Sequence, residues 1–397
     1  MTEIERLRQE VHEVLENNIL RFWIDRMQDD EHGGFYGRID NNNVLRADAD
    51  KGAILNARIL WTFSAAYRVL HKPAYLEMAR RAKTYFLDHF IDRVDGGVYW
   101  SLDYKGEPKD TKKQFYAIGF AIYGLSEYVR ATGDREALEQ AINLYHCIEA
   151  HALDHLSGGY IEAMTRDWKP MSDMRLSEHD ANYPKSQNTH LHIIEPYTNL
   201  YRVWSSAELR HSLRNIIGIF TDKILNPATH HLDLFFNMDW TRATEQCESY
   251  GHDIECSWLM HEAALVLGDK DLLRRVEPIV KAVASASEKG LNADGSMIHE
   301  ANITTGTIDD DLHWWVQSEA VVGFINLYQH FDDRQALEKA LQCWQYIKNN
   351  LIDYQNGEWY WSRHRDGSLN CIDDKAGFWK CPYHNGRMCL EILERQF

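Results

Sequence analysis

The chain has 397 residues and carries 43 lysines and arginines against 60 aspartates and glutamates, so its formal charge is −17 with histidine neutral. A nucleic acid or an anionic membrane requires a basic face, and this charge argues against both as the main partner. Apolar residues make up 44% of the chain and charged residues 26%, which is typical of a globular protein with a sizeable core and excludes long disorder.

No segment has the composition of a targeting signal or a membrane span. Residues 1–18 are charged throughout, and no later stretch approaches about 18 uncharged apolar residues. We therefore expect a soluble cytoplasmic protein. The seven cysteines form an odd set without a C-x-x-C pair, which favours reduced thiols over a disulfide framework or a structural zinc site.

A short phrase returns six times along the chain. Each copy has an Asp or Asn, then a Gly or a polar pair, and then alternating aromatic or apolar residues; the copies begin near residues 29, 91, 153, 225, 291 and 352. Their reference positions are 62 to 72 residues apart. The sequence thus predicts six repeated units, each with a turn and a short hairpin-like segment.

Between the copies, apolar residues recur three and four positions apart, which is typical of amphipathic helices. Polar breaks such as Gly133-Asp134 and Gly268-Asp269 split most intervals into two helices. The predicted helices span residues 3–25, 51–70, 73–91, 112–131, 134–152, 187–204, 207–225, 251–267, 269–289, 313–331, 333–351 and 383–395. Twelve helices correspond to six helical hairpins.

Six hairpins could stack into an open superhelix or close into a ring, and the repeat alone leaves both open. The helices that follow the long loops carry unusual polar or aromatic residues, namely Arg58, Tyr116, Asn188 with His192, His252 with Glu255, Trp314-Trp315 with Glu319, and His384. In a closed (α/α)6 barrel these helices would form the inner ring and deliver those groups to one mouth. We predict an all-α (α/α)6 barrel with residues 1–397 as a single catalytic domain.

Individually, most of these residues have an ordinary structural interpretation. His252 and Glu255 lie three apart on one helical face, where the carboxylate could hold the imidazole in one tautomer, although such pairs are common in structural roles. Asn188 and His192 share a face in the same way. Arg58 in an apolar helix requires a partner or a wet cavity. Their equivalent placement in successive repeats is what favours a shared site.

The aromatic content suggests the class of ligand. Thirteen tryptophans and twenty tyrosines make an aromatic, hydrogen-bonding cavity plausible, and such a cavity suits sugars. The motifs for dinucleotide binding, phosphate loops and zinc peptidases are missing from the sequence. Three histidines and a glutamate could still bind a metal, so the residues alone leave that open.

Four motifs, SYGHDIECSW, HWWVQSEAVVGF, KSQNTHLH and WKCPYHNGRMCLE, resemble the cellobiose 2-epimerases of the N-acylglucosamine 2-epimerase superfamily of (α/α)6 barrels. The similarity extends over essentially the whole chain. It implies reversible epimerisation at C2 of the reducing-end glucose of β-1,4-linked disaccharides, giving glucosylmannose from cellobiose and epilactose from lactose. The resemblance implies an isomerase with no cofactor and no metal, acting on a small disaccharide as a monomer.

The resemblance also implies roles for individual residues. His252 and His384 match the general acid/base pair, and Glu255 matches the acid that supports His252. The residues that match the sugar-binding set are Arg58, Tyr116, Asn188, His192 and Trp315 around the reducing-end sugar, and Asp180 and Trp379 at the second sugar. We add Glu319 to this set and count His192 among the catalytic residues. Gln187 and Cys256 depart from the Met and Ala expected there, so the fine shape of the pocket is not given by the resemblance.

Elementary chemistry agrees with that reaction. A C2 proton becomes acidic only after the hemiacetal opens to a C1 carbonyl, and its removal gives a cis-enediolate. Arg58, His192 and Asn188 are candidate donors to its negative charge. Two imidazoles of near-neutral pKa, on opposite sides of this plane, could remove a proton from one face and return it to the other.

Three alternatives stay open from the sequence. The first is a monosaccharide enzyme of the same superfamily, such as a mannose 2-epimerase, an aldose–ketose isomerase or the N-acylglucosamine epimerase. The second is an (α/α)6 glycoside hydrolase, which needs two carboxylates flanking the bond. The third is a sugar-binding protein without catalysis.

Overall fold

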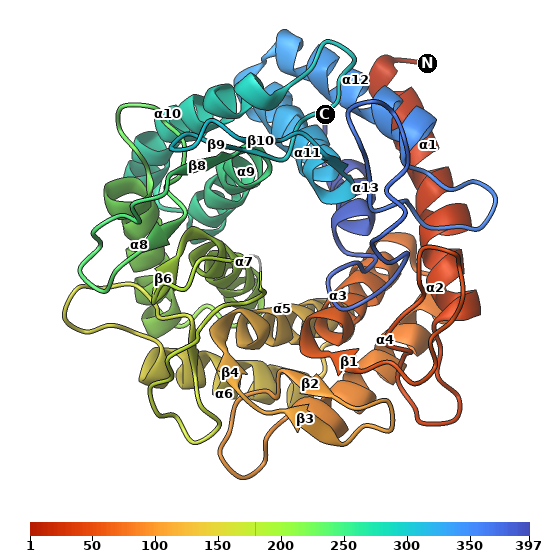
Figure 1. Ribbon diagram of the computed structural model, residues 1–397, viewed down its shortest axis with the longest axis vertical. Helices are drawn as coiled ribbons and strands as arrows, with labels where there is room; N and C mark the ends of the chain where they lie inside the picture. Colours follow the sequence, from red (N-terminus) through yellow and green to blue (C-terminus); the bar gives the residue numbers. More distant parts are fainter. Residues whose placement is uncertain (179) are drawn as a thin grey trace.

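The computed structural model describes residues 1–178 and 180–397, and its helices lie in two concentric rings (Figure 1). The inner ring consists of α3 (Ala53–Leu70), α5 (Phe115–Thr132), α7 (Gln187–Val203), α9 (Tyr250–Leu267), α11 (Trp314–Phe331) and α13 (His384–Glu394). The outer ring consists of α1 (Glu3–Val14) with α2 (Arg21–Arg26), α4 (Pro73–Tyr85), α6 (Arg135–His151), α8 (Ala207–Ile219), α10 (Lys270–Ser287) and α12 (Arg334–Asn350). Short π- or 3-10 turns join α1 to α2 and extend α4, α8 and α10.

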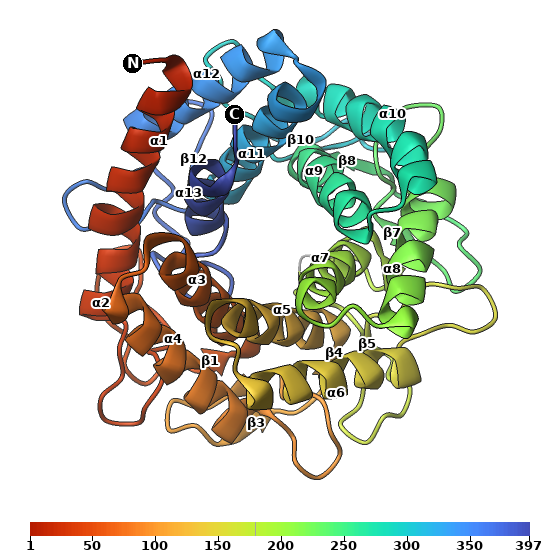
Figure 2. The same ribbon diagram turned by 180° about the vertical axis from the view of Figure 1, so that it is seen from behind.

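The inner ring is closed. Each inner helix packs against the next, and α13 completes the circle by packing against both α11 and α3, as the view from behind also shows (Figure 2). The inner helices are buried almost all round, for example from Ala53 to Ala66 in α3. The outer helices bury one face only, so they follow the amphipathic pattern expected of a surface helix. These residues therefore form an (α/α)6 barrel, which confirms the predicted fold class.

Small antiparallel sheets lie on the loops at one end of the barrel. Their strands are β1 (Lys51–Gly52), β2 (Ser101–Leu102), β3 (Pro108–Asp110), β4 (Lys113–Gln114), β5 (Ala163–Met164), β6 (Lys185–Ser186), β7 (Phe235–Phe236), β8 (Cys247–Ser249), β9 (Glu300–Asn302), β10 (Ile308–Asp309), β11 (Leu312–His313) and β12 (Ser362–Arg363). They pair in the orders β1-β2-β3, β10-β9-β8, β11-β12, β4-β5 and β6-β7. Several of these strands run directly into an inner helix and so fix where that helix begins.

The six sequence copies are six equivalent turns. Each is closed by an antiparallel bridge, at Gln28↔Phe35, Ile91↔Val98, Leu153↔Tyr160, Leu225↔Leu232, Leu291↔Met297 and Ile352↔Trp359. In four copies the leading aspartate binds a buried lysine that lies shortly before an inner helix, as in the Asp29–Lys51 and Asp92–Lys113 pairs at 2.7 and 2.9 Å. These buried ion pairs tie four of the six turns to the segment before an inner helix at the mouth of the barrel.

Counted together with the π- and 3-10 turns that extend the outer helices, the helices have limits that agree with the predicted ones to within a few residues. The largest discrepancies lie at the starts of inner helices: residues 51–52 and 113–114, predicted as helix, are the strands β1 and β4. Apolar periodicity cannot detect a two-residue strand that leads into a helix. Within the described residues, no helix is long and apolar enough to cross a membrane.

Candidate active site

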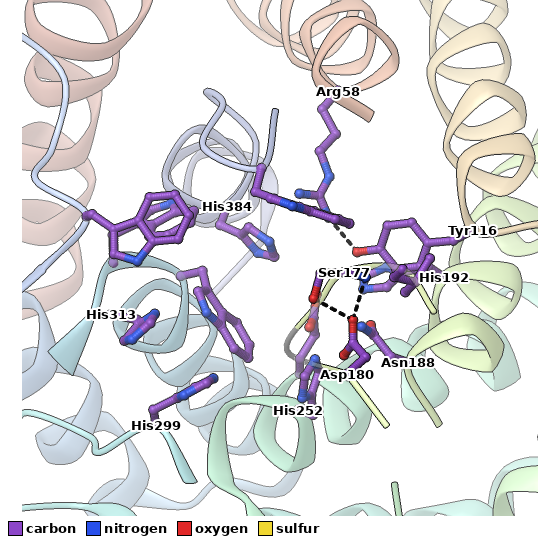
Figure 3. Close-up of a pocket in the computed structure, with 16 residues that line it drawn as sticks. Arg58, Tyr116, Ser177, Asp180, Asn188, His192, His252, His299, His313 and His384 are labelled. Carbon is purple, nitrogen blue, oxygen red and sulfur yellow. Dashed lines mark hydrogen bonds between the residues drawn. The ribbon is translucent and has the colours of Figure 1, made fainter. Parts of the chain in front are cut away.

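A polar and aromatic cavity of about 270 Å³ lies at the loop-bearing mouth of the barrel (Figure 3). Every inner helix contributes to it from its N-terminal half: Arg58, Tyr116, Asn188, His192, His252, Glu255, Trp314, Trp315 and His384. The loops add Leu176, Ser177, Asp180, His299, His313, Trp361 and Trp379. The predicted site residues therefore meet in one cavity, with Glu319 as the exception.

His384 is the first residue of α13, only 6% exposed, and its ring is held from behind by a carboxylate. Its Nδ1 lies 2.7 Å from Oε1 of Glu319, which also accepts from the indole Nε1 of Trp258 at 3.0 Å through its other oxygen. Glu319 is fully buried behind His384 and does not line the cavity. The structure thus places Glu319 outside the cavity, where its carboxylate orients His384 rather than lining the site predicted for it.

His252 is held differently. Its Nδ1 lies 2.8 Å from the hydroxyl of Ser249, and its ring packs against the indole of Trp315 with centroids 4.9 Å apart. The expected support from Glu255 is not what the structure shows, because Glu255 instead accepts a hydrogen bond from Arg387 at 2.6 Å. The i, i+3 spacing places the two side chains on one helix, but the guanidinium competes successfully for the carboxylate.

Arg387 of α13 is the centre of a buried charge network that sequence reasoning missed. Its guanidinium donates to Glu195, to Glu255 at 2.6 Å and to Glu319 at 2.7 Å, and it also bonds the hydroxyl of Tyr383. Arg387 and the three carboxylates are at most 2% exposed. The available signal was an arginine inside an otherwise buried helix, the same signal that marked Arg58.

One cation faces three buried carboxylates, so their protonation differs. Burial raises the pKa of a carboxyl, but Arg387 and the hydrogen bond to His384 outweigh it and lower the pKa of Glu319 to about 2. Arg387 also outweighs burial at Glu195 and lowers its pKa. At Glu255, burial and repulsion from Glu319 prevail and raise the pKa well above its ordinary range. Of the three carboxyls, Glu255 is the one whose environment most favours the protonated form.

The two imidazoles have pKa values far from the near-neutral ones we expected. Burial is the main cause at both, and it lowers the pKa of His252 and of His384 to about 3. At His384 this effect exceeds the opposing one of Glu319. Both rings are consequently neutral near pH 7 in the free protein and have a ring nitrogen able to accept a proton.

His192 lies on the opposite wall and also has a carboxylate partner. Its Nδ1 is 3.0 Å from Oε2 of Glu195, three residues further along α7. The helix is kinked at His192 (φ −90°, ψ 16°), because the ring of Pro196 displaces the carbonyl four residues earlier. Gly119 of α5 makes room for it: a Cβ there would lie 2.3 Å from the His192 carbonyl oxygen.

Arg58, Tyr116 and Asn188 of the predicted sugar-binding set bring further hydrogen-bonding groups to the cavity. Arg58 donates from Nη2 to the hydroxyl of Tyr116 at 2.9 Å, and its guanidinium lies over the ring of Phe120 at 4.2 Å. Oδ1 of Asn188 is buried and has no hydrogen-bond partner among the described residues. An amide oxygen in that situation is available to a ligand hydroxyl.

Asp180 and Trp379 lie on loops at the rim of the cavity. Oδ2 of Asp180 accepts from the backbone N–H and the hydroxyl of Ser177, at 2.8 and 2.7 Å. The indole of Trp379 packs edge-on against Trp100 and Tyr116. Asp180 therefore offers a fixed acceptor and Trp379 an aromatic surface to a group that extends out of the cavity.

Among the residues that the structure describes, three groups of side chains have the composition of a metal site. Two of them, His192-Glu195-Glu255 and Glu255-Glu319-His384, contain carboxylates that already bind the Arg387 guanidinium, which repels a second cation. The third, His299-Asp309-His313, has its two imidazoles stacked 4.4 Å apart and within 16° of parallel. In-plane lone pairs on stacked rings do not converge on one ion.

The fold and the site together define a class of protein, an (α/α)6-barrel protein with a polar, aromatic cavity at its mouth that contains two imidazoles. The N-acylglucosamine 2-epimerase family model matches residues 34–386, and the chain belongs to this family. It is 61% identical to a cellobiose 2-epimerase of Bacteroides fragilis, over 98% of this chain and 99% of that one. Identity to a cellobiose 2-epimerase of Ruminococcus albus is 41%, over 97% and 98% of the two chains.

Solved structures of the family have the same architecture. The cellobiose 2-epimerase of Bacillus thermoamylovorans superimposes with a TM-score of 0.94 at 42% identity, over 99% of this chain and all of that one. A D-mannose isomerase reaches a TM-score of 0.84 at 19% identity, which shows a shared fold only.

Proposed function

We propose that the protein is a cellobiose 2-epimerase, which interconverts glucose and mannose at the reducing end of cellobiose and of lactose without a cofactor. The observation that carries this proposal is the convergence of two neutral imidazoles, His252 and His384, in one cavity, where both pack against the Trp315 indole with centroids 4.9 and 5.7 Å away. The similarity to enzymes named cellobiose 2-epimerases, over nearly the whole chain, supports the choice of substrate.

The first step opens the sugar ring. A proton moves from O1 to an acceptor and another reaches the ring oxygen, so that the C1 hemiacetal becomes an aldehyde. His192, held by Glu195, is the group we assign to this transfer, because its ring lines the cavity and packs edge-on against Tyr116. Arg58 and Asn188 then hold the aldehyde oxygen and a neighbouring hydroxyl.

The second step inverts C2. One imidazole removes the C2 proton, the C–H electron pair forms the C1–C2 double bond, and the carbonyl electrons move onto O1 as a cis-enediolate. Arg58, fixed by Tyr116 and over Phe120, supplies positive charge to that oxygen. The imidazole on the other face takes up a proton from water beside the negative enediolate and donates it to C2, and the first imidazole returns its proton to water. The negative enediolate favours a protonated ring beside it, which offsets the low pKa values of the empty site.

The rim residues give the proposal its disaccharide specificity. Asp180 and Trp379 line the cavity from its loops, and we assign them to the 4-linked sugar; they would have little to contact in a monosaccharide complex. We further propose that residues 1–397 act as one catalytic domain, and that the chain works as a monomer.

The experiment is a panel of cellobiose, lactose, mannose and N-acetylglucosamine in deuterium oxide, followed by chromatography and NMR. We expect glucosylmannose from cellobiose and epilactose from lactose, each with deuterium at C2 of the reducing-end sugar. Conversion of mannose alone would replace the proposal with a monosaccharide enzyme, and release of free glucose would indicate a hydrolase. A complete lack of exchange at C2 would leave only sugar binding.

A further inference from the structure

Ser249 occupies the N-cap position of α9 but does not cap the helix. Serine at this position ordinarily accepts from a backbone N–H two or three residues later. Ser186, the N-cap of the neighbouring inner helix α7, does so, with its hydroxyl 3.0 Å from the N–H of Thr189. Ser249 makes no such bond. A cap bond worth about 1 kcal/mol is therefore forgone here.

The Ser249 hydroxyl instead binds the imidazole of His252. The distance from Oγ to Nδ1 is 2.8 Å, and Ser249 is 1% exposed. Strand β8 fixes the backbone of Ser249 by pairing it with Glu300 of β9. The first turn of α9 fixes His252, so both partners are held by secondary structure rather than by a loose loop.

We propose that Ser249 is a positioning residue for His252: its hydroxyl accepts the Nδ1–H of the imidazole and so directs the Nε2 lone pair toward C2 of the sugar. This inference rests on the proposed epimerase function. It assigns to a neutral hydroxyl the role that the sequence predicted for the carboxylate of Glu255.

The two imidazoles have chemically different partners: a hydroxyl at His252 and a carboxylate at His384. Ionised Glu319 can only accept from Nδ1 of His384 and carries a charge that stabilises an imidazolium. A serine hydroxyl fixes the tautomer without adding a negative charge. His252 is therefore oriented as firmly as His384, yet its protonated form receives less stabilisation from its partner.

The test compares Ser249→Ala and Ser249→Thr with a matched control, Ser257→Ala. Ser257 lies two turns further along α9, is fully buried, and donates only to the carbonyl of Ile254 at 2.7 Å. With cellobiose we expect kcat of Ser249→Ala to fall about tenfold, the worth of one hydrogen bond to a reacting group, with KM changed less than about twofold. Ser249→Thr keeps the hydroxyl and should recover most of the loss.

A spectroscopic measurement separates positioning from folding. Nitrogen NMR of ¹⁵N-histidine-labelled protein reports the tautomer of each ring, and the His252 signal is identified by its loss in His252→Asn. We expect the Nδ1–H tautomer in the parent and in Ser257→Ala, and an increased share of Nε2–H in Ser249→Ala.

Three outcomes would overturn the inference: unchanged kcat in Ser249→Ala, an unchanged His252 tautomer, or losses of activity and melting temperature that Ser257→Ala shares equally. The parent is assayed first for deuterium exchange at C2. A parent without exchange would reject the proposed function itself, whereas a normal parent with an indifferent Ser249→Ala variant would reject only the role of Ser249.

Discussion

His384 and His252, the two imidazoles of the proposed acid/base pair, are held in place by different kinds of partner. His384 is backed by charge: Glu319 holds its Nδ1, and Arg387 joins Glu319 to two further carboxylates. His252 is backed by the Ser249 hydroxyl and the Trp315 ring, with Glu255 turned away toward Arg387. Both rings are neutral and held in one orientation, so an imidazole can be positioned either with or without a carboxylate partner.

Removing Arg387, the centre of the buried charge network, should have the largest effect of the predicted changes. Arg387→Met removes the cation shared by Glu195, Glu255 and Glu319 and leaves uncompensated buried charge. We expect the free energy of unfolding to fall by about 3–5 kcal/mol, as measured by denaturant titration. Arg6→Met on the outer helix α1 is the control and should change it by less than about 0.5 kcal/mol. Equal stability of the two variants would contradict the network.

Removing either imidazole tests whether both histidines are needed for the epimerisation. His252→Ala and His384→Ala should each lower kcat for cellobiose by a factor on the order of 10² or more, the usual loss for an acid–base group. Deuterium exchange at C2 is measured alongside, starting separately from the gluco and the manno disaccharide. A variant that keeps its turnover would remove that residue from the acid/base pair.

Neutralising the partner of His384 should have a smaller effect. Glu319→Gln keeps the shape of the side chain but removes the charge that orients and stabilises the His384 ring, so we expect kcat to fall about 10- to 100-fold with little change in KM. The exposed Glu338→Gln on α12 is the matched control. A rise in KM with kcat preserved would instead return Glu319 to the sugar-binding set.

The smallest expected effect is on pH-dependent stability. The pKa of His384 is about 3 in the folded protein and near 6.5 in an unfolded chain, so the unfolded state binds the extra proton between those values. Stability should therefore fall as the pH drops from 6.5 toward 3, and the melting temperature at pH 5 should lie at least about 2 °C below that at pH 7. His384→Asn should show a shallower decline in calorimetry. An identical decline in both proteins would place the titration elsewhere.

Much of the architecture was predictable from the sequence because it depends on local rules. The six turns were found from their repeated Asp, Gly and aromatic residues, and the helices from apolar periodicity. The closed ring was not determined by these local rules, since it depends on the packing of α13 against α3 across more than 300 residues of chain. The closure of the ring was anticipated from the polar residues at equivalent helix starts and from the family resemblance.

The candidate site also has a part that could be predicted from the sequence and a part that could not. The residues that face the cavity were predictable, because polar groups at the starts of buried helices have few other uses. Their partners were not: the same His-x-x-Glu spacing occurs at His192-Glu195, where the pair forms, and at His252-Glu255, where it does not. Spacing fixes a shared face, but it does not reveal which neighbouring cation will take the carboxylate.

The amino-acid sequence by itself determined six helical hairpins and the set of imidazole, amide and indole groups at their inner starts. Only the tertiary structure decided that Arg387 draws in Glu195, Glu255 and Glu319, and that Ser249 is left to hold His252. The physical reason is that a buried carboxylate binds the strongest donor within reach, and reach is set by residues far apart along the chain.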